Sequence, residues 1–543
     1  MLTYRHILFA LTATIALGST AQTLRKEITV QHEVVPEPTE VTKLRFSPQF
    51  TLPKLPATML EYARQGVFTA VDPTISPLGP AAYCDTIYTS PYKGYANLGI
   101  APVYNLGASA GYKFVDNDRT RLNAWLQYNG NAYKGLYHGS PFDGQYQRTN
   151  TATVALALHH ALSNERYLDM GADYTFSRYS TPANTDSTGR QQIHRANLSA
   201  LYSANTSTLS YSAGGGIGYF GYSFAPEGMH ASRELKVDLL GKIASEISTD
   251  QRAGLNLDFN LISTSRHAQA PGHTHALLSL APFYDLRLST LELHAGIKAQ
   301  ITINSGKALH IAPDVIATWH PTQYLSIYGK AGGGEWQNTL SSLFDATPYG
   351  LGAMAYGNSH LPITVEGGLT AGPFKGLAVE LSWLYAAANN WRMPVTTQEG
   401  WTVFDQLDMR GYKFHAGISY QYGTRLELRT AYETAPQKAA RGYYLWRDRA
   451  RHTLTADLRF TPVTPLDIFL GWEYRGSRAQ ISPQGDFSPL GHVSNLNAGA
   501  LYRITSQWSA FIHGENLLCH RYLLIGGVPA QGITGLIGAS YKF

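Results

Sequence analysis

The chain is poor in cysteine, in charged side chains and in long apolar runs. Its 543 residues include only two cysteines, Cys84 and Cys519, which excludes a disulfide framework and a cysteine-based zinc cluster but leaves open whether the two pair. Charged residues make up 15% of the chain, and no later segment approaches 18 consecutive apolar residues, so we expect no transmembrane helix. The net charge of +5 is spread along the chain and implies no nucleic-acid partner.

The N-terminal residues 1–21 have the pattern of a secretory signal peptide. Arg5 and His6 precede an apolar stretch of twelve residues, and Ser19 and Ala21 occupy the small positions before a cut ahead of Gln22. The apolar stretch is too short to serve as a membrane anchor. We therefore expect an exported mature chain.

Residues 22–94 differ from the rest of the chain in their proline content. They hold nine of the 27 prolines. Because proline has no amide hydrogen to donate to a sheet, we expect an extended, irregular arm, either periplasmic or inside a lumen.

From residue 95 onward, apolar residues alternate with polar or small ones in runs of about ten. Asp457 and Arg459 alternate with leucine, alanine and phenylalanine in one run, and Asp467, Glu473 and Arg475 alternate with apolar residues in the next. Successive side chains of a strand point to opposite faces, so each run predicts a half-apolar β-strand. A soluble sandwich shows the same alternation, so the alternation alone does not decide the fold.

The links between these strands decide the fold, because short and long links alternate. The short ones are 116–119, 163–165, 248–251, 288–290, 320–323, 373–376, 422–424, 462–465 and 505–507. The long ones include 129–147, 179–192, 264–274, 336–361, 389–406, 434–451 and 476–492. This pattern is typical of outer-membrane barrels.

We therefore predict an all-β protein, a transmembrane antiparallel β-barrel over residues 95–543. The count is about 22 strands, with 20 as the main alternative, and residues 95–114 form two strands that break near Pro102–Asn105. Short turns face the periplasm and long links face outside. The polar faces point inward, so the expected lumen-lining charges are Asp457, Arg459, Asp467, Glu473 and Arg475.

The C-terminal stretch G-L-I-G-A-S-Y-K-F predicts a strand that runs to the last residue. One face of this strand carries Ile537, Ala539, Tyr541 and Phe543. We expect this strand to close the barrel on the first strand and to leave Phe543 in the periplasmic aromatic girdle. The four residues resemble the insertion signal of outer-membrane barrels, which implies the barrel assembly machinery as a partner.

Residues 511–543 resemble the C-terminal end of TonB-dependent receptors. The matching residues are Glu515, Asn516, Leu517, Tyr522, Pro529, Gly532, Gly538, Tyr541 and Phe543. Cys519 departs from the family, which usually has asparagine there. The resemblance implies a receptor-like barrel, although receptors carry a plug domain of well over a hundred residues and only 73 residues precede the barrel here. The chain thus resembles receptor-like barrels without a plug. Glu27, Ile28, Thr29 and Val30 resemble the box through which receptors engage TonB.

No group of residues favours catalysis or cofactor binding. The motifs G-A-S-A-G at 107–111 and G-I-G-Y-F-G at 216–221 lack the following helix that their chemistry needs. His267, His273 and His275 share one long link and are interpreted as ordinary loop histidines. The basic, aromatic segment 441–452 is expected in an outer loop, touching lipopolysaccharide phosphates. We expect neither an enzyme nor a cofactor.

The expected function is the passage or uptake of solutes across the outer membrane. The alternative is a barrel that assembles or anchors a surface lipoprotein or a periplasmic partner. A 22-stranded barrel encloses a lumen that transporters of this size fill with a plug. We therefore predict that the arm partly threads the lumen and that links such as 336–361 fold inward.

Overall fold

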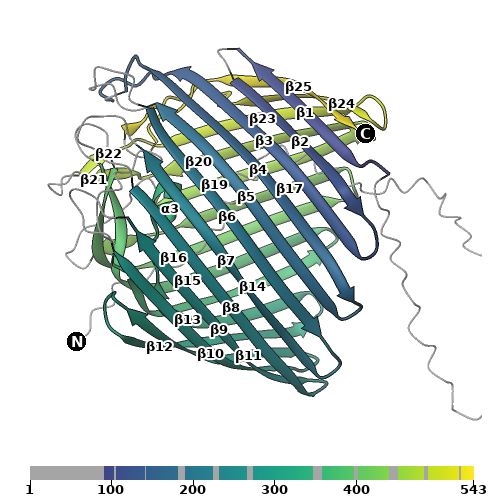
Figure 1. Cartoon of the computed structure of the whole chain (residues 1–543). Coiled ribbons are helices and arrows are strands. Elements are labelled where there is room, and N and C mark those ends of the chain that lie inside the picture. Colours follow the sequence, from purple (N-terminus) through teal and green to yellow (C-terminus); the bar gives the residue numbers. More distant parts are fainter. Residues whose placement is uncertain are drawn as a thin grey trace, which may run out of the picture. The chain divides into compact units, whose positions relative to one another are not determined.

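The protein is described by a computed structural model over residues 91–102, 105–140, 142–180, 190–223, 232–265, 273–346, 357–396, 402–439, 450–481, 487–524 and 527–543. The predicted signal peptide, the TonB-box-like segment 27–30 and the arm up to residue 90 lie outside these ranges. The strands form one antiparallel wall, drawn in Figure 1. Among the described residues, no helix is long and apolar enough to cross a membrane.

The wall strands follow one another in chain order. The first eleven are β1 (Gly94–Ala101), β2 (Asn105–Asp116), β3 (Thr120–Lys134), β4 (Tyr146–Ser163), β5 (Arg166–Ser180), β6 (Arg190–Asn205), β7 (Leu209–Ser223), β8 (Ser232–Ser248), β9 (Gln251–Thr264), β10 (Thr274–Arg287) and β11 (Leu291–Ile303). The other eleven are β12 (Leu309–Thr322), β13 (Leu325–Trp336), β14 (Ser359–Phe374), β15 (Leu377–Thr396), β16 (Thr402–Tyr422), β17 (Leu426–Thr434), β19 (His452–Val463), β20 (Leu466–Gly476), β23 (Val493–Arg503), β24 (Trp508–Glu515) and β25 (Thr534–Lys542).

Three short strands lie outside this ring. The first, β18 (Gln437–Ala439), pairs with β16, whereas β21 (Ala479–Ile481) and β22 (Phe487–Pro489) form a separate hairpin. The ring therefore has 22 strands and closes where β25 pairs with β1, from Tyr95↔Lys542 to Ile100↔Ile537. The predicted fold class and strand count are confirmed, as is the break between β1 and β2.

Short turns gather at one rim of the barrel and longer links at the other, which we call the short-turn rim and the long-link rim. Residues 206–208 form a further short turn that the sequence analysis did not include. The alternation is also less strict than expected, because the links 102–104 and 304–308 at the long-link rim are short. Asn304 and Gly306 adopt positive φ there, which lets the chain reverse tightly between β11 and β12.

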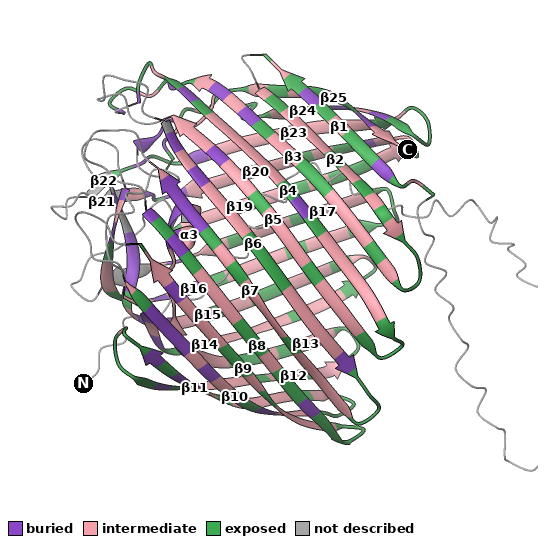
Figure 2. Ribbon diagram, in the orientation of Figure 1, coloured by how far each residue is buried: buried purple, intermediate pink, exposed green. Residues whose placement is uncertain are grey.

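The outer face of the wall carries large apolar side chains. Ile217, Ile311 and Ile537 are 52%, 68% and 61% exposed, far more than a soluble protein's strands would leave in water. These side chains form the band that faces lipid. Buried residues instead gather toward the long-link rim, as Figure 2 shows by the purple segments around α3.

Candidate functional site

The link between β13 and β14 carries the helix α3 (Leu340–Ala346). Its sequence begins the helix through a reciprocal cap. The Thr339 hydroxyl accepts the amide of Ser342 at 3.0 Å, and the Ser342 hydroxyl accepts the amide of Thr339 at 3.1 Å. This is a capping box with serine in place of the usual glutamate. The first turn of α3 is therefore fixed by its own side chains.

An apolar cluster holds α3 against the inner face of the wall. Leu343 is 1% exposed and Phe344 is 4% exposed. The ring of Phe344 lies 4.5 Å from that of Tyr222 and 5.2 Å from that of Phe220, both on β7. The complete cluster is Ile193, Phe220, Tyr222, Leu340, Leu343, Phe344 and Phe404. It joins β6 and β7 to β16 through the helix, and Figure 1 shows α3 inside the outline of the wall.

Polar contacts hold the same helix. The Leu340 amide donates to the carboxylate of Glu234 on β8 at 2.6 Å, and Glu234 is only 3% exposed. At the other end of α3, Asp345 forms an ion pair with Arg195 of β6. Arg392 of β15 donates to the Ser342 hydroxyl. The link 336–361 thus folds inward as predicted, in the part of it that the structure describes, and it is held from two sides of the mouth.

A second link, 516–533, packs against the inner side of the long-link rim. Phe142 and Val528 bury each other's side chains, and the Ser140 hydroxyl donates to the Gly527 carbonyl at 2.6 Å. The Tyr133 hydroxyl donates to the Pro529 carbonyl at 2.9 Å. The segment that carries the receptor-like motif is therefore held against the end of β3 and the link that follows it.

Asn516 is the centre of that motif. Its side-chain amide donates to the carbonyls of His520 and Gln531, both at 3.0 Å, and its side-chain oxygen accepts the His520 amide at 3.0 Å. After β24 ends, the backbone groups no longer have a neighbouring strand to bond, and these side-chain hydrogen bonds satisfy them instead. The resemblance at these positions thus has a physical basis in loop geometry.

The predicted lumen-lining charges occupy the face opposite the exposed apolar residues of β19 and β20. Two pairs form among the five. Arg459 lies 3.7 Å from Asp467, and Arg475 lies 2.8 Å from Glu473. Asp467 also bonds Arg503, a residue that the sequence analysis missed because β23 shows no charge pattern. Asp457 is exposed on the same face.

The predicted insertion-signal residues lie on the outer face at β25. Ile537 and Phe543 are 61% and 46% exposed, and the ring of Tyr541 lies 4.5 Å from that of Trp508. This arrangement is a local aromatic cluster at the short-turn rim. Whether assembly factors read it stays a prediction.

The loop histidines separate into two groups. The rings of His273 and His275 stack with centroids 5.1 Å apart, whereas His267 lies outside the described residues. Most of the basic segment 441–452 also lies outside them. Two adjacent rings supply two nitrogens, too few for the three or four ligands of a zinc site.

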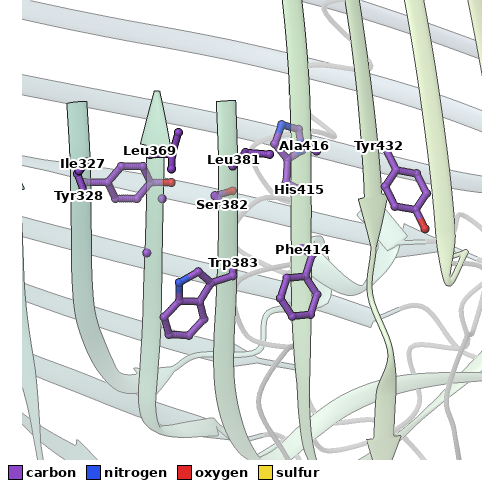
Figure 3. Close-up of a pocket in the computed structure, with 12 residues that line it drawn as sticks. Ile327, Tyr328, Leu369, Leu381, Ser382, Trp383, Phe414, His415, Ala416 and Tyr432 are labelled. Atoms are coloured by element: carbon purple, nitrogen blue, oxygen red, sulfur yellow. The ribbon is translucent and has the colours of Figure 1, made fainter. Parts of the chain in front are cut away.

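An apolar groove on the wall, drawn in Figure 3, lies over β13 to β17. Trp383 and Phe414 stand opposite each other on β15 and β16, and both are more than 40% exposed on the face that carries the lipid-facing band. Trp383 covers Gly367, where a Cβ would lie 2.8 Å from the indole nitrogen. The groove is therefore a place for lipid chains and not for a polar solute.

Comparisons with known proteins agree with this architecture. No protein-family model and no curated protein matches the chain. Among solved structures, it resembles the FrpB iron transporter from Neisseria meningitidis, with a TM-score of 0.67, 10% identity, and 84% of this chain and 82% of that chain covered. It also resembles the siderophore receptor PirA from Acinetobacter baumannii, with a TM-score of 0.67, 10% identity, and coverages of 84% and 81%. The ferripyoverdine receptor of the outer membrane of Pseudomonas aeruginosa matches with a TM-score of 0.62, 12% identity, and coverages of 84% and 72%.

The structural matches, at 10–12% identity, establish the fold. The protein is a 22-stranded transmembrane barrel, and the resemblance to TonB-dependent receptors is confirmed for the barrel architecture. The proteins that it resembles are receptors and transporters. The predicted lack of a plug concerns residues before 91, which the structure does not describe, and it stays a prediction.

Proposed function

We propose that the protein passes a solute across the outer membrane through a mouth that the α3 link narrows. The observation that carries this proposal is the double anchoring of α3, by the apolar cluster around Leu343 and by the bonds from Glu234, Arg195 and Arg392. A helix held by side chains from two sides of a lumen restricts passage until those contacts break. The similarity to an iron transporter and to a siderophore receptor supports an iron complex as the class of solute.

The test is conductance in a planar lipid bilayer. The purified protein should conduct little, and a variant with Leu340→Ser, Leu343→Ser and Phe344→Ser should conduct several-fold more, because the helix loses its apolar anchor. Ser341→Ala serves as a control on the same helix and should leave conductance unchanged. If the triple variant conducts no more than the parent protein, the α3 link is not the barrier.

A second deletion separates the link from the N-terminal arm. Removal of residues 24–80 should raise conductance if the arm also threads the lumen. A deletion that stays closed and loses a co-purifying protein would instead favour the role of an assembly or anchoring barrel.

A further inference from the structure

Three side chains with metal-ligand chemistry converge at the long-link rim, close to the α3 link. They are His310 at the start of β12, Glu335 near the end of β13 and His360 near the start of β14, and their ligand atoms all lie within 4.8 Å of one another. The Nε2 of His310 and the Nδ1 of His360 each lie 2.9 Å from the same carboxylate oxygen of Glu335. Within the described ranges, no other such group of three was found.

The backbone is shaped to bring these three together. A register shift interrupts the pairing of β13 with β14 between Gly332 and Gly334, and Gly334 has a φ of +120°. Bulges of this kind re-aim the side chains that follow them. The side-chain oxygen of Gln300 then accepts the Glu335 amide at 2.7 Å and fixes the re-aimed backbone.

The electrostatics of the cluster call for a cation. The Glu335 side chain is 4% exposed, and in the described part of the chain its only ion-pair partners within 4 Å are the two imidazoles. A buried carboxylate is costly unless a positive charge pairs with it, and a cation bound between the carboxylate and the two imidazoles would supply that charge.

The imidazole geometry also favours an ion over a simple hydrogen-bonded trio. The Nδ1 of His360 is buried and makes no hydrogen bond, although the carboxylate oxygen is 2.9 Å away. Zinc binds nitrogen and oxygen at about 2.0–2.2 Å, so a tetrahedral site sets its ligand atoms roughly 3.4 Å apart, about half an ångström wider than the 2.9 Å separations here. The Lys307 carbonyl oxygen, 2.7 Å from His310 Nε2, offers a fourth ligand atom. The His360 side chain is 25% exposed, which leaves an open side for an ion to enter.

We propose that His310, Glu335 and His360 bind a divalent transition-metal ion of the zinc type, which ties down the ends of the α3 link. Two imidazoles and one carboxylate suit zinc, and the same donors bind Co²⁺. Glu335 and His360 stand opposite each other on β13 and β14, at the two ends of the link. An ion shared with His310 would clamp both ends of the link to β12. This role is separate from the passage of solutes, so the two proposals can fail independently.

The binding test uses the full-length protein in detergent micelles after treatment with a chelator. Titration with Co²⁺ should produce the visible absorption bands of a four-coordinate site, and Zn²⁺ should displace Co²⁺ at one ion per chain. Glu335→Gln and His360→Ala should each weaken Zn²⁺ binding by at least ~100-fold, at or beyond the upper end of the loss seen on removing a ligand's hydrogen-bond partner.

The matched control is His159→Ala. His159 lies 2.6 Å from Asp169 on the wall, so it has the same residue types without a third donor, and its loss should leave Zn²⁺ affinity unchanged. Heat-modifiable migration on a gel verifies that each variant is folded. Equal Zn²⁺ affinity in the parent protein and all three variants, or no saturable binding by the folded parent, would overturn the site.

A separate experiment tests whether the bound ion holds the α3 link in place. A Leu343→Cys variant that also carries Cys84→Ser and Cys519→Ser should react with a thiol reagent at least several-fold more slowly with Zn²⁺ than with a chelator. Adding His360→Ala should abolish that difference. If the protein binds Zn²⁺ but the labelling rate of the Leu343→Cys variant is the same with and without Zn²⁺, the ion does not hold the link.

Discussion

The ring of Phe543 covers Gly94 so closely that a Cβ on residue 94 would lie 2.5 Å from two ring carbons. The same ring stacks on Tyr112 with centroids 6.2 Å apart, and the Phe543 carbonyl accepts the amides of Lys93 and Gly94, each at 2.8 Å. The last residue of the chain therefore seals the seam between the first and last strands, on the lipid-facing side. Glycine at 94 is what makes room for the ring.

We expect Gly94→Val to weaken the closure of the barrel. The new side chain would displace the Phe543 ring, and overpacking of this kind costs about 1–3 kcal/mol. The fraction of folded, heat-modifiable protein and its midpoint of unfolding in urea should both fall. Gly329→Ala is the control, because a Cβ there meets nothing within 4 Å. A Gly94→Val protein as stable as the parent would show that the seam tolerates a shifted ring.

The orientation of the barrel is tested by single cysteines in a background of Cys84→Ser and Cys519→Ser. His138 lies in a link of the long-link rim with its side chain fully exposed, and Asp118 lies in an exposed turn of the short-turn rim. We expect His138→Cys to react with a membrane-impermeant maleimide on intact cells, and Asp118→Cys to react only after the outer membrane is opened. The opposite result would invert the predicted topology.

The fold could be predicted from the sequence because its main signals are local. The period-two alternation, the short turns and the terminal Phe543 each depend on neighbouring residues, and together they gave the strand number. The His310, Glu335 and His360 group could not be predicted in this way. Each of the three residues is separated from the next by 25 positions in the sequence. They meet only through the register of three strands and the bulge at Gly332–Gly334. The contact of Arg503 with Asp467 was missed because β23 shows no charge pattern that would mark Arg503.

The packing of α3 is tested by hydrogen exchange. Leu343→Ala should leave a cavity in a cluster where Leu343 is 1% exposed, at a cost of about 2–5 kcal/mol. Amides of residues 340–346 should then exchange faster by at least about tenfold, while the wall strands keep their protection, because local opening is separate from global unfolding. Leu309→Ala, at a site 50% exposed on the outer face, is the control. Unchanged exchange in the helix would mean that polar contacts alone hold it.

Cys519 stands where the receptor family usually has asparagine, and its backbone φ is +51°. An L-residue in this left-handed region loses roughly 1–2 kcal/mol, and asparagine enters it more readily because its side chain bonds the local backbone. The turn is otherwise well held, since the Cys519 amide donates to the Asn516 carbonyl at 2.8 Å. The unfavourable conformation is therefore imposed by the neighbouring bonds of Asn516.

We expect Cys519→Asn to stabilise the folded barrel by roughly 0.5–1 kcal/mol, a part of the left-handed cost. Cys519→Gly should gain about as much, because glycine adopts positive φ without strain, though its greater freedom in the unfolded chain offsets some of the gain. Cys519→Ala should gain nothing, since alanine removes the thiol but keeps a Cβ. The measurement is the midpoint of urea unfolding for the parent protein and the three variants, all in the same lipid composition. An alanine variant as stable as the asparagine variant would assign the effect to loss of the thiol, and backbone strain at residue 519 would then play no part.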